Sequence, residues 1–200
     1  MVKAKQAWYC NYKLGKIKEL YFKYLQHKYM FQHWHTTPIN FRPYAIGIVN
    51  YLNKQRKKKV VEIGCGLGEI VGNITNCERM GVDVDTNVIK VAKKLYRKTN
   101  FEVGTFENIR NQKIDYLITV NFIHRIPSEL LKEKYSYLCR NNDIRHIVLD
   151  IVDSPEYQFN HDIDYLSKEL GYRVKKRLHR YQVTNGSRWI YILERNHGDK

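Results

Sequence analysis

The sequence predicts an α/β protein built on a doubly wound, mostly parallel seven-stranded sheet, with N-terminal helices before it and an antiparallel C-terminal hairpin. Short β-branched segments alternate with helical segments after residue 60, at spacings that suit parallel crossover connections. An Asn-Gly pair between the last two apolar segments is a strong hairpin signal. We expect an N-terminal helical cap or extension over residues 1–40 and a larger domain over residues 41–200.

Two helices are predicted before the first strand. The first carries an apolar stripe, which we expect to pack against the sheet, at Leu14, Ile17, Tyr21, Tyr24 and Phe31. The second begins near Pro43, because a proline at the first helical position costs no hydrogen bond. It ends in the basic run of residues 54–59.

Strands and helices alternate through the rest of the chain. Strands are expected at residues 60–63, 79–84, 101–104, 114–120, 146–152, 172–182 and 188–194. Helices are expected at residues 69–76, 88–96, 127–138 and 162–170. The segment 114–120 is continuously apolar apart from Thr119, which indicates a strand buried on both faces.

Composition and charge narrow the class of protein. The 200 residues are 43% hydrophobic, which is ample for a folded core. A net charge of +15 favours anionic partners such as nucleic acid, phosphorylated metabolites or an acidic membrane surface, although a basic surface can also serve solubility alone. The four cysteines lack the CxxC spacing of a zinc site. We expect a cytoplasmic location, because the N-terminus is too polar for a secretory signal and no apolar run approaches the roughly 18 residues of a membrane span.

The most informative segment is Val-Val-Glu-Ile-Gly-Cys-Gly-Leu-Gly at residues 60–68. Glycines at 64 and 66 let the backbone and a ligand approach each other, and Gly68 lets the chain turn tightly against the strand. An ordinary tight turn does not need three alternating glycines. Glu69 stands where a dinucleotide fingerprint requires glycine, and the Gly-Lys-Ser/Thr of a P-loop is missing, so neither phosphate-binding motif fits.

Three segments together resemble the class I S-adenosylmethionine-dependent methyltransferases: Glu-Ile-Gly-Cys-Gly-Leu-Gly at 62–68, Gly-Val-Asp-Val-Asp at 81–85 and Ile-Asp-Tyr-Leu-Ile-Thr-Val-Asn at 114–121. The resemblance covers roughly residues 44–195 and implies a Rossmann-like methyltransferase fold that binds S-adenosyl-L-methionine. It implies that Glu62, Gly64 and Gly66 contact the methionine and ribose region and that Asp83 holds the ribose hydroxyls. A cationic sulfonium also favours carboxylates near this turn, where they would repel a phosphate.

The segments after the third and fourth strands supply further candidates. Thr105 or Glu107 is a candidate for the adenine amino group, and Phe106 for stacking on adenine or for the core. Residues 121–124, Asn-Phe-Ile-His, resemble the Asn-x-x-His type of small-molecule members and differ from the Asn-Pro-Pro-Tyr type of base-amino methyltransferases. His124 is the candidate general base, or it anchors the loop. The candidate cofactor-binding residues are Glu62, Gly64, Cys65, Gly66, Asp83, Val84, Thr105, Phe106 and Asn121, and no metal ligand is proposed.

Other polar segments have two interpretations. Arg42 suits an anionic acceptor or the surface, and the aromatic segment around Trp34 either closes over the cofactor or packs on the sheet. Asp150, Asp153 and His161 suit an acceptor or metal site, although surface solvation is the preferred explanation for Asp153 and His161. The basic residues of the penultimate strand indicate a charged sheet edge or a phosphate-binding stripe. They are Arg173, Lys175, Lys176, Arg177, His179 and Arg180.

We therefore expect a methyltransferase that acts on a small molecule, by O-methyl transfer to a sugar, a glycan precursor or a related metabolite. The charge is compatible with an anionic acceptor. The alternatives are an RNA methyltransferase and a noncatalytic basic nucleic-acid-binding module with the same fold.

Overall fold

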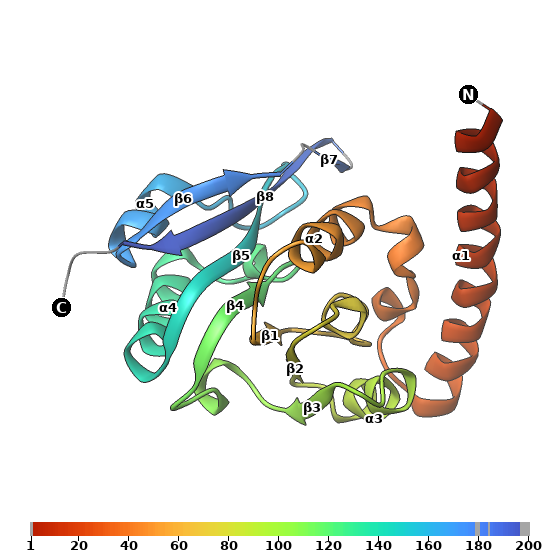
Figure 1. Ribbon diagram of the computed structural model, residues 1–200, viewed down its shortest axis with the longest axis horizontal. Coiled ribbons are helices and arrows are strands. Elements are labelled where there is room, and N and C mark those ends of the chain that lie inside the picture. The colour runs from red at the N-terminus through yellow and green to blue at the C-terminus, as the bar shows by residue number, and fades with distance from the viewer. Residues whose placement is uncertain (1, 179–180, 184, 197–200) are drawn as a thin grey trace.

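One sheet of eight strands forms the centre of the described part of the chain, which comprises residues 2–178, 181–183 and 185–196 of the computed structural model (Figure 1). The strands are β1 (Lys59–Ile63), β2 (Glu78–Asp83), β3 (Asn100–Val103), β4 (Lys113–Thr119), β5 (Asp143–Asp153), β6 (Tyr172–Arg177), β7 (Tyr181–Val183) and β8 (Gly186–Arg195). Their order is β3-β2-β1-β4-β5-β8-β6, and β7 also pairs with β8.

The first five strands are parallel, and β1 pairs with β2 on one side and β4 on the other. The direction of winding therefore reverses between β1 and β4, and the carboxyl ends of these strands border the usual ligand crevice of such a sheet. β8 is antiparallel to both β5 and β6, which confirms the predicted C-terminal hairpin. The predicted strand 172–182 is divided into β6 and β7. His179, Arg180 and Thr184 lie outside the described residues.

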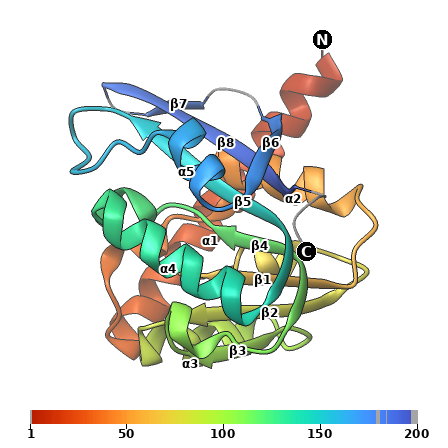
Figure 2. The ribbon, with the colours of Figure 1, turned by 90° about the vertical axis from the view of Figure 1, so that its left-hand side faces the viewer.

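Helices cover both faces of the sheet. Helices α2 (Pro43–Asn53) and α3 (Thr86–Leu95) lie on one face, and α4 (Ser128–Asn141) and α5 (Ile163–Glu169) lie on the other, in front of the strands in Figure 2. Ile48 and Leu52 of α2 are fully buried in one core, and Leu131 and Tyr135 of α4 in the other. Short 3-10 helices complete the fold: η1 (His33–Thr36), η2 (Ile39–Phe41), η3 (Val71–Asn73), η4 (Phe106–Asn108) and η5 (Ile123–Arg125).

The prediction of a helix at residues 69–76 is wrong. Only the single turn of η3 forms there, and the chain is otherwise irregular up to β2. Gly72 and several β-branched residues give this segment a low helix propensity. The amide of Val71 instead donates to the carboxylate of Glu62, at 2.9 Å, so the segment is shaped by the end of β1.

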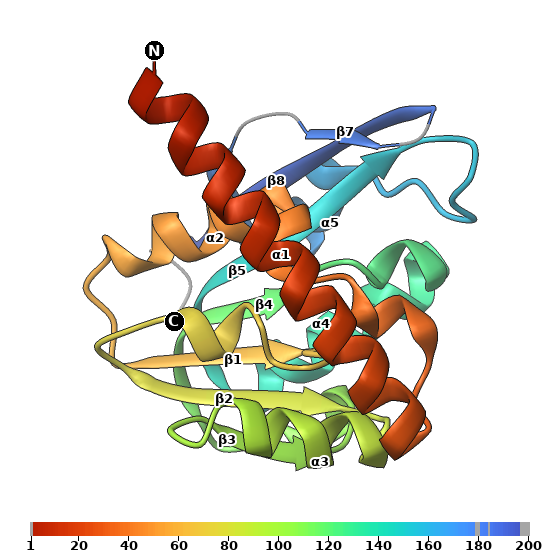
Figure 3. The ribbon, with the colours of Figure 1, turned by 90° about the vertical axis from the view of Figure 1, so that its right-hand side faces the viewer.

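The apolar stripe of the first helix does not pack against the sheet, contrary to prediction. In α1 (Val2–Tyr29), the residues that face the protein are Phe22 and Leu25, which pack with Leu67 and with Val88 and Val91 of α3. The residues predicted to be buried, Leu14, Ile17, Tyr21 and Tyr24, are exposed, and of the stripe only Phe31 is buried. Figure 3 shows α1 crossing the outside of the molecule, so that one of its faces has no neighbour within the described chain.

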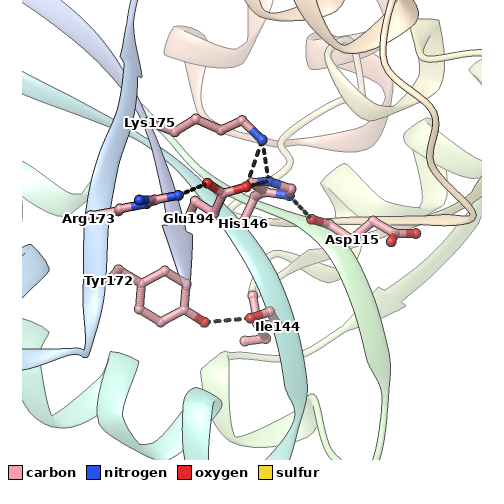
Figure 4. Close-up of polar contacts among 7 residues, drawn as sticks. All are labelled: Asp115, Ile144, His146, Tyr172, Arg173, Lys175 and Glu194. Carbon is pink, nitrogen blue, oxygen red and sulfur yellow. Dashed lines mark hydrogen bonds and ion pairs between the residues drawn. The ribbon is translucent and has the colours of Figure 1, made fainter. Parts of the chain in front are cut away.

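A polar cluster joins the antiparallel strands to the parallel ones (Figure 4). Glu194 of β8 accepts from Arg173 at 3.0 Å and from Lys175 at 2.8 Å, and its Oε1 lies 3.2 Å from Nε2 of His146 on β5. The other nitrogen of His146 donates to the backbone carbonyl of Asp115, at 3.0 Å. β6 lies at the sheet edge as predicted, and two of its cations are held by a carboxylate of the fold.

Candidate active site

The glycine turn after β1 is held by the carboxylate at the end of β2. Asp83 is buried, and its two oxygens accept from the amides of Gly66, at 2.9 Å, and Asp85, at 3.0 Å. Gly64 and Gly66 have φ angles of +69° and +54°, which side chains rarely tolerate. A Cβ on Gly64 would lie 2.7 Å from the ring of Phe122, and one on Gly66 would lie 3.0 Å from Nδ1 of His35.

Glu62, the last polar residue of β1, is buried beside this turn. Burial raises the pKa of its carboxyl to about 8, although the amide of Val71 and the charge of Arg42 oppose the shift. Loss of hydration disfavours the ionised form, whereas a cation brought into contact with Glu62 would favour it. The site therefore contains a carboxyl group that a cationic ligand would favour in its ionised form.

A cavity of about 620 Å³ lies over the turn, at the carboxyl ends of β1, β2 and β4. Its walls include all nine predicted cofactor-binding residues and the predicted base: Glu62, Gly64, Cys65, Gly66, Asp83, Val84, Thr105, Phe106, Asn121 and His124. This volume lies in the range of small-molecule and cofactor sites. The sequence thus predicted a set of residues that the structure brings together, and their individual roles remain predictions.

The N-terminal segment forms another wall of the same cavity. Gln32, Trp34, His35 and Thr37 line it between α1 and α2. Buried Glu69 fixes this segment, because it contacts Arg42 at 2.5 Å and Lys18 of α1 at 2.6 Å. Glu69 therefore serves as the anchor of the N-terminal segment.

A second cavity of about 420 Å³ adjoins the first. Trp34, Thr37, Arg42, Tyr44 and Asn121 line both cavities. The walls of the second include the aromatic side chains of Trp34, Phe41, Tyr44 and Tyr181, and the described charged residues among its lining are two arginines, Arg42 and Arg188. The guanidinium of Arg188 lies 4.4 Å from the centre of the Tyr44 ring, and its Nε is 3.3 Å from the buried carboxylate of Asp150.

His124 is the middle residue of η5, and its side chain is buried against Tyr157, whose ring centre is 4.2 Å from that of the imidazole. Its Nδ1 is buried and has no hydrogen-bond partner within the described residues. Burial lowers the pKa of His124 to about 4, and the nearby charges of Arg188 and Arg125 add to this effect. The imidazole is thus neutral near pH 7 and presents an unused polar atom beside the cavity.

The residues after β3 make contacts within the protein. The hydroxyl of Thr105 contacts the carboxylate of Glu107, which also binds Lys134 at 3.0 Å. Phe106 is buried and contacts the rings of Phe122 and Tyr135, so it is a core residue whose edge also borders the cavity. Val84, by contrast, exposes 69% of its surface at the cavity wall.

Asp150, Asp153 and His161 do not form a common site. Asp150 is buried and accepts from the amide of Asn121 at 3.0 Å, whereas Asp153 is exposed. His161 is buried, so surface solvation is the wrong explanation for it. Its Nε2 donates to the carbonyl of Ile123, at 2.9 Å, and its Nδ1 lies 3.1 Å from the hydroxyl of Ser128. These bonds fix the loop that carries His124. No cluster of metal-binding side chains is present among the described residues.

Two residues near the cavities were not predicted. Tyr157 packs on His124, and Arg188 reaches the second cavity from β8. His35, which flanks Trp34 in the segment expected either to close over the cofactor or to pack on the sheet, stands over Gly66. The sequence offers no signal for Tyr157. An arginine with alternating apolar neighbours in β8 could have marked Arg188 as a buried cation.

The residues present fit S-adenosylmethionine. Each oxygen of Asp83 accepts one amide and retains capacity for a second hydrogen bond, as a ribose diol requires. Glu62 places a second buried carboxyl near the turn, which suits a cationic ligand. A Cβ at Gly64 or Gly66 would contact Phe122 or His35, so the backbone of the turn lies close to the side chains around it.

This fold and this turn define the class I S-adenosylmethionine-dependent methyltransferases. A sequence profile of the methyltransferase-domain family matches residues 54–178, well over half of the chain. The chain belongs to this family, and its cofactor is S-adenosylmethionine.

Known proteins agree with this assignment. The chain is similar to the probable S-adenosylmethionine-dependent methyltransferase CRG1 of Saccharomyces cerevisiae, with 27% identity over 184 residues, 80% of this chain and 62% of the yeast protein. A putative methyltransferase, 235L, of invertebrate iridescent virus 6 is 38% identical over 71 residues, 32% of this chain and 26% of the viral protein. The chain thus spans less than two thirds of either relative.

Solved structures show the same fold at low sequence identity. Magnesium protoporphyrin IX methyltransferase from Synechocystis, with bound S-adenosylhomocysteine, has a TM-score of 0.66 at 14% identity, covering 78% of this chain and 83% of its own. The N-methyltransferase NodS from Bradyrhizobium japonicum, with the same ligand, has a TM-score of 0.64 at 11% identity, covering 78% and 87%.

Proposed function

We propose that the chain methylates a small molecule that binds in the second cavity, while the first cavity holds S-adenosylmethionine. The observation that carries this proposal is the junction of the two cavities at Asn121, directly after β4. A reaction between two bound molecules requires their reacting atoms to approach closely, and adjoining cavities provide that proximity. The cofactor supplies a methyl group on a positively charged sulfur.

The residues of the first cavity divide the binding of the cofactor. Asp83 accepts hydrogen bonds from the ribose hydroxyls and keeps the glycine turn in place through Gly66. Glu62 balances positive charge near the turn, and Val84 provides an apolar surface for the adenine. Trp34 and His35 exclude water from the same space.

The second cavity favours a planar or anionic acceptor. The aromatic side chains suit rings and the apolar faces of sugars. Arg42 and Arg188, each already paired with a buried carboxylate of the protein, supply the described positive charges near an anionic acceptor. His124 lines the first cavity, and for an acceptor hydroxyl that reaches from the second cavity toward the methyl group it is the candidate general base. The acceptor is, by this proposal, a sugar, a glycan precursor or a related metabolite that is methylated on oxygen.

The test is transfer of labelled methyl groups from S-adenosylmethionine into a polar metabolite and glycan extract, beside total RNA. We expect label in the extract, and we expect Gly66→Val to abolish it because a side chain would fill the turn. Label confined to RNA would overturn the small-molecule proposal in favour of an RNA methyltransferase. Salt-sensitive RNA binding without transfer to either pool would favour a noncatalytic module.

A further inference from the structure

Helix α1 presents an apolar face that the described chain does not cover. Leu14, Ile17, Leu20, Tyr21 and Tyr24 have exposed fractions between 49% for Tyr21 and 68% for Leu20. Their spacing places them within about one third of the helix circumference, and Phe22 and Leu25, which pack on α3, occupy the neighbouring part of it. Contiguous exposed apolar surface of this kind marks an interaction site.

Basic residues accompany this face. Lys13, Lys16, Lys23 and Lys28 are exposed on α1. Glu19 is the one acidic residue in the sequence of this helix, and it is already paired with Lys16 and Lys23, each at 2.9 Å. The exposed part of α1 therefore combines large apolar side chains with a positive charge.

We propose that this face of α1 binds the surface of a membrane that contains anionic lipids. A helix with an apolar face and flanking lysines lies in the plane of such an interface, with its apolar side chains among the acyl chains and its cations at the headgroups. Tyrosines have an apolar ring and a polar tip, which suits this boundary. A second copy of the chain fits less well, because it would bring two lysine-rich helices together in molecules of net charge +15.

The shape of the protein is compatible with this binding. α1 is the outermost element on its side of the molecule, so a flat surface can reach its exposed face along much of its length (Figures 1 and 3). Within the described residues, no helix combines the length and apolarity that crossing a bilayer requires. The interaction is thus one of lying on the surface.

The experiment is co-sedimentation of the whole chain with vesicles, either of phosphatidylcholine alone or with about one quarter phosphatidylserine, at about 0.1 M salt. We expect binding to the anionic vesicles and little to the neutral ones. Ile17→Ser with Leu20→Ser should reduce binding about tenfold or more, because both side chains leave the apolar face. Lys16→Gln with Lys23→Gln should weaken binding to anionic vesicles. The remaining binding should also be less sensitive to salt, because fewer charges take part.

Matched control variants test whether the place of the substituted residues on α1 matters, or only the loss of exposed apolar side chains and positive charges. Leu130→Ser with Val174→Ser removes two exposed apolar residues from α4 and β6, and Lys54→Gln with Arg56→Gln removes two charges at the amino end of β1. Both should bind vesicles as the parent does, and circular dichroism melts check that every variant folds. Equal loss in the matched variants, or no binding by the parent, would overturn the proposal. So would a parent dimer in sedimentation velocity that Ile17→Ser with Leu20→Ser makes monomeric, because a second copy would then cover the face.

Discussion

At the scale of single residues, Glu62 is a side chain whose charge depends strongly on its surroundings. Burial raises its pKa from 4.5 to about 8 in the folded chain. The folded state therefore binds a proton that the unfolded state releases between these values, and the contribution of Glu62 to stability is lost as the pH rises through this window.

Glu62→Gln should remove this dependence. The variant keeps an acceptor for the amide of Val71 but carries no ionisable group. Its free energy of unfolding should exceed that of the parent above about pH 8 and approach it near about pH 5. Urea denaturation at both pH values measures the difference, and isothermal titration with S-adenosylhomocysteine should show weaker binding by the variant. A larger stability gain at the lower pH would contradict the assigned pKa shift.

His124 leads to a prediction about the pH dependence of methyl transfer. Because burial lowers its pKa to about 4, the imidazole is neutral throughout the range in which the protein is assayed. The rate at saturating substrate should be flat from about pH 5.5 to 8, and His124→Asn should lower it by about 100-fold with little change in cofactor affinity. An inflection near pH 6.5 that disappears in the variant would mean that His124 is far less buried during the reaction.

The sequence revealed those site residues that lie in local motifs. The spacing of the glycines and of Asp83 places them at the ends of adjacent parallel strands, so their meeting could be predicted. Tyr157 and Arg188 reach the cavities from the loop after β5 and from β8. Their arrival depends on how these distant segments pack, which no spacing within one segment encodes.

At the scale of elements, the glycine turn is the place where backbone conformation and binding are joined. Gly66→Ala should cost about 1–2 kcal/mol of stability for its positive φ and should also reduce cofactor affinity, because the new Cβ lies beneath His35. Gly171→Ala is the matched control, since Gly171 has a φ of +72° with no atom near a built Cβ. It should show the stability loss alone. Equal losses of affinity in the two variants, measured by calorimetry, would show that the glycine turn does not contact the cofactor.

Elements were predictable where the hydrophobic pattern had one solution. The buried strands and α2 were found within a few residues because β-branched runs and a proline at the helix start leave little choice. The helix expected at 69–76 failed because Glu62, which lies in another element, binds the amide of Val71. The stripe of α1 was correctly helical, but its pattern does not tell which apolar side faces the protein: Phe22 and Leu25 do so, and Leu14 and Ile17 do not.

At the scale of the whole molecule, Glu194 joins the antiparallel edge to the parallel sheet. Hydrogen bonds from Lys175 above all, and also from Arg173, lower its pKa from 4.5 to about 2. A carboxylate with a lowered folded-state pKa adds stability that is complete above about pH 4.5 and is lost as the pH falls toward 2.

Glu194→Gln should therefore lower the free energy of unfolding by about 1 kcal/mol near pH 7. The difference from the parent should shrink as the pH falls below about 4.5, because the parent then loses the same charge. Thermal or urea unfolding across this range measures it. Asp143→Asn serves as the control, since its half-exposed pair with Arg195 should contribute little. A deficit that stays constant down to pH 2 would show that the charge is not the cause.

The order of the strands in the sheet could be predicted only in part from the sequence. The alternation of strands and helices predicts a parallel sheet, and the Asn-Gly pair predicts a terminal hairpin. The insertion of β8 between β5 and β6 follows from partners far apart in the chain, such as His146 and Glu194. The same contacts neutralise part of the basic edge, which net charge alone could not reveal.

The carboxylate of Glu69 has a last consequence. It is the common counterion of Lys18, on the helix proposed to lie on lipid, and of Arg42, which lines both cavities. If lipid binding and ligand binding both shift Glu69, the two equilibria are coupled, and thermodynamic reciprocity makes the coupling equal in both directions. If contact with lipid raises the affinity for S-adenosylmethionine, then bound S-adenosylmethionine must raise the affinity for lipid by the same factor.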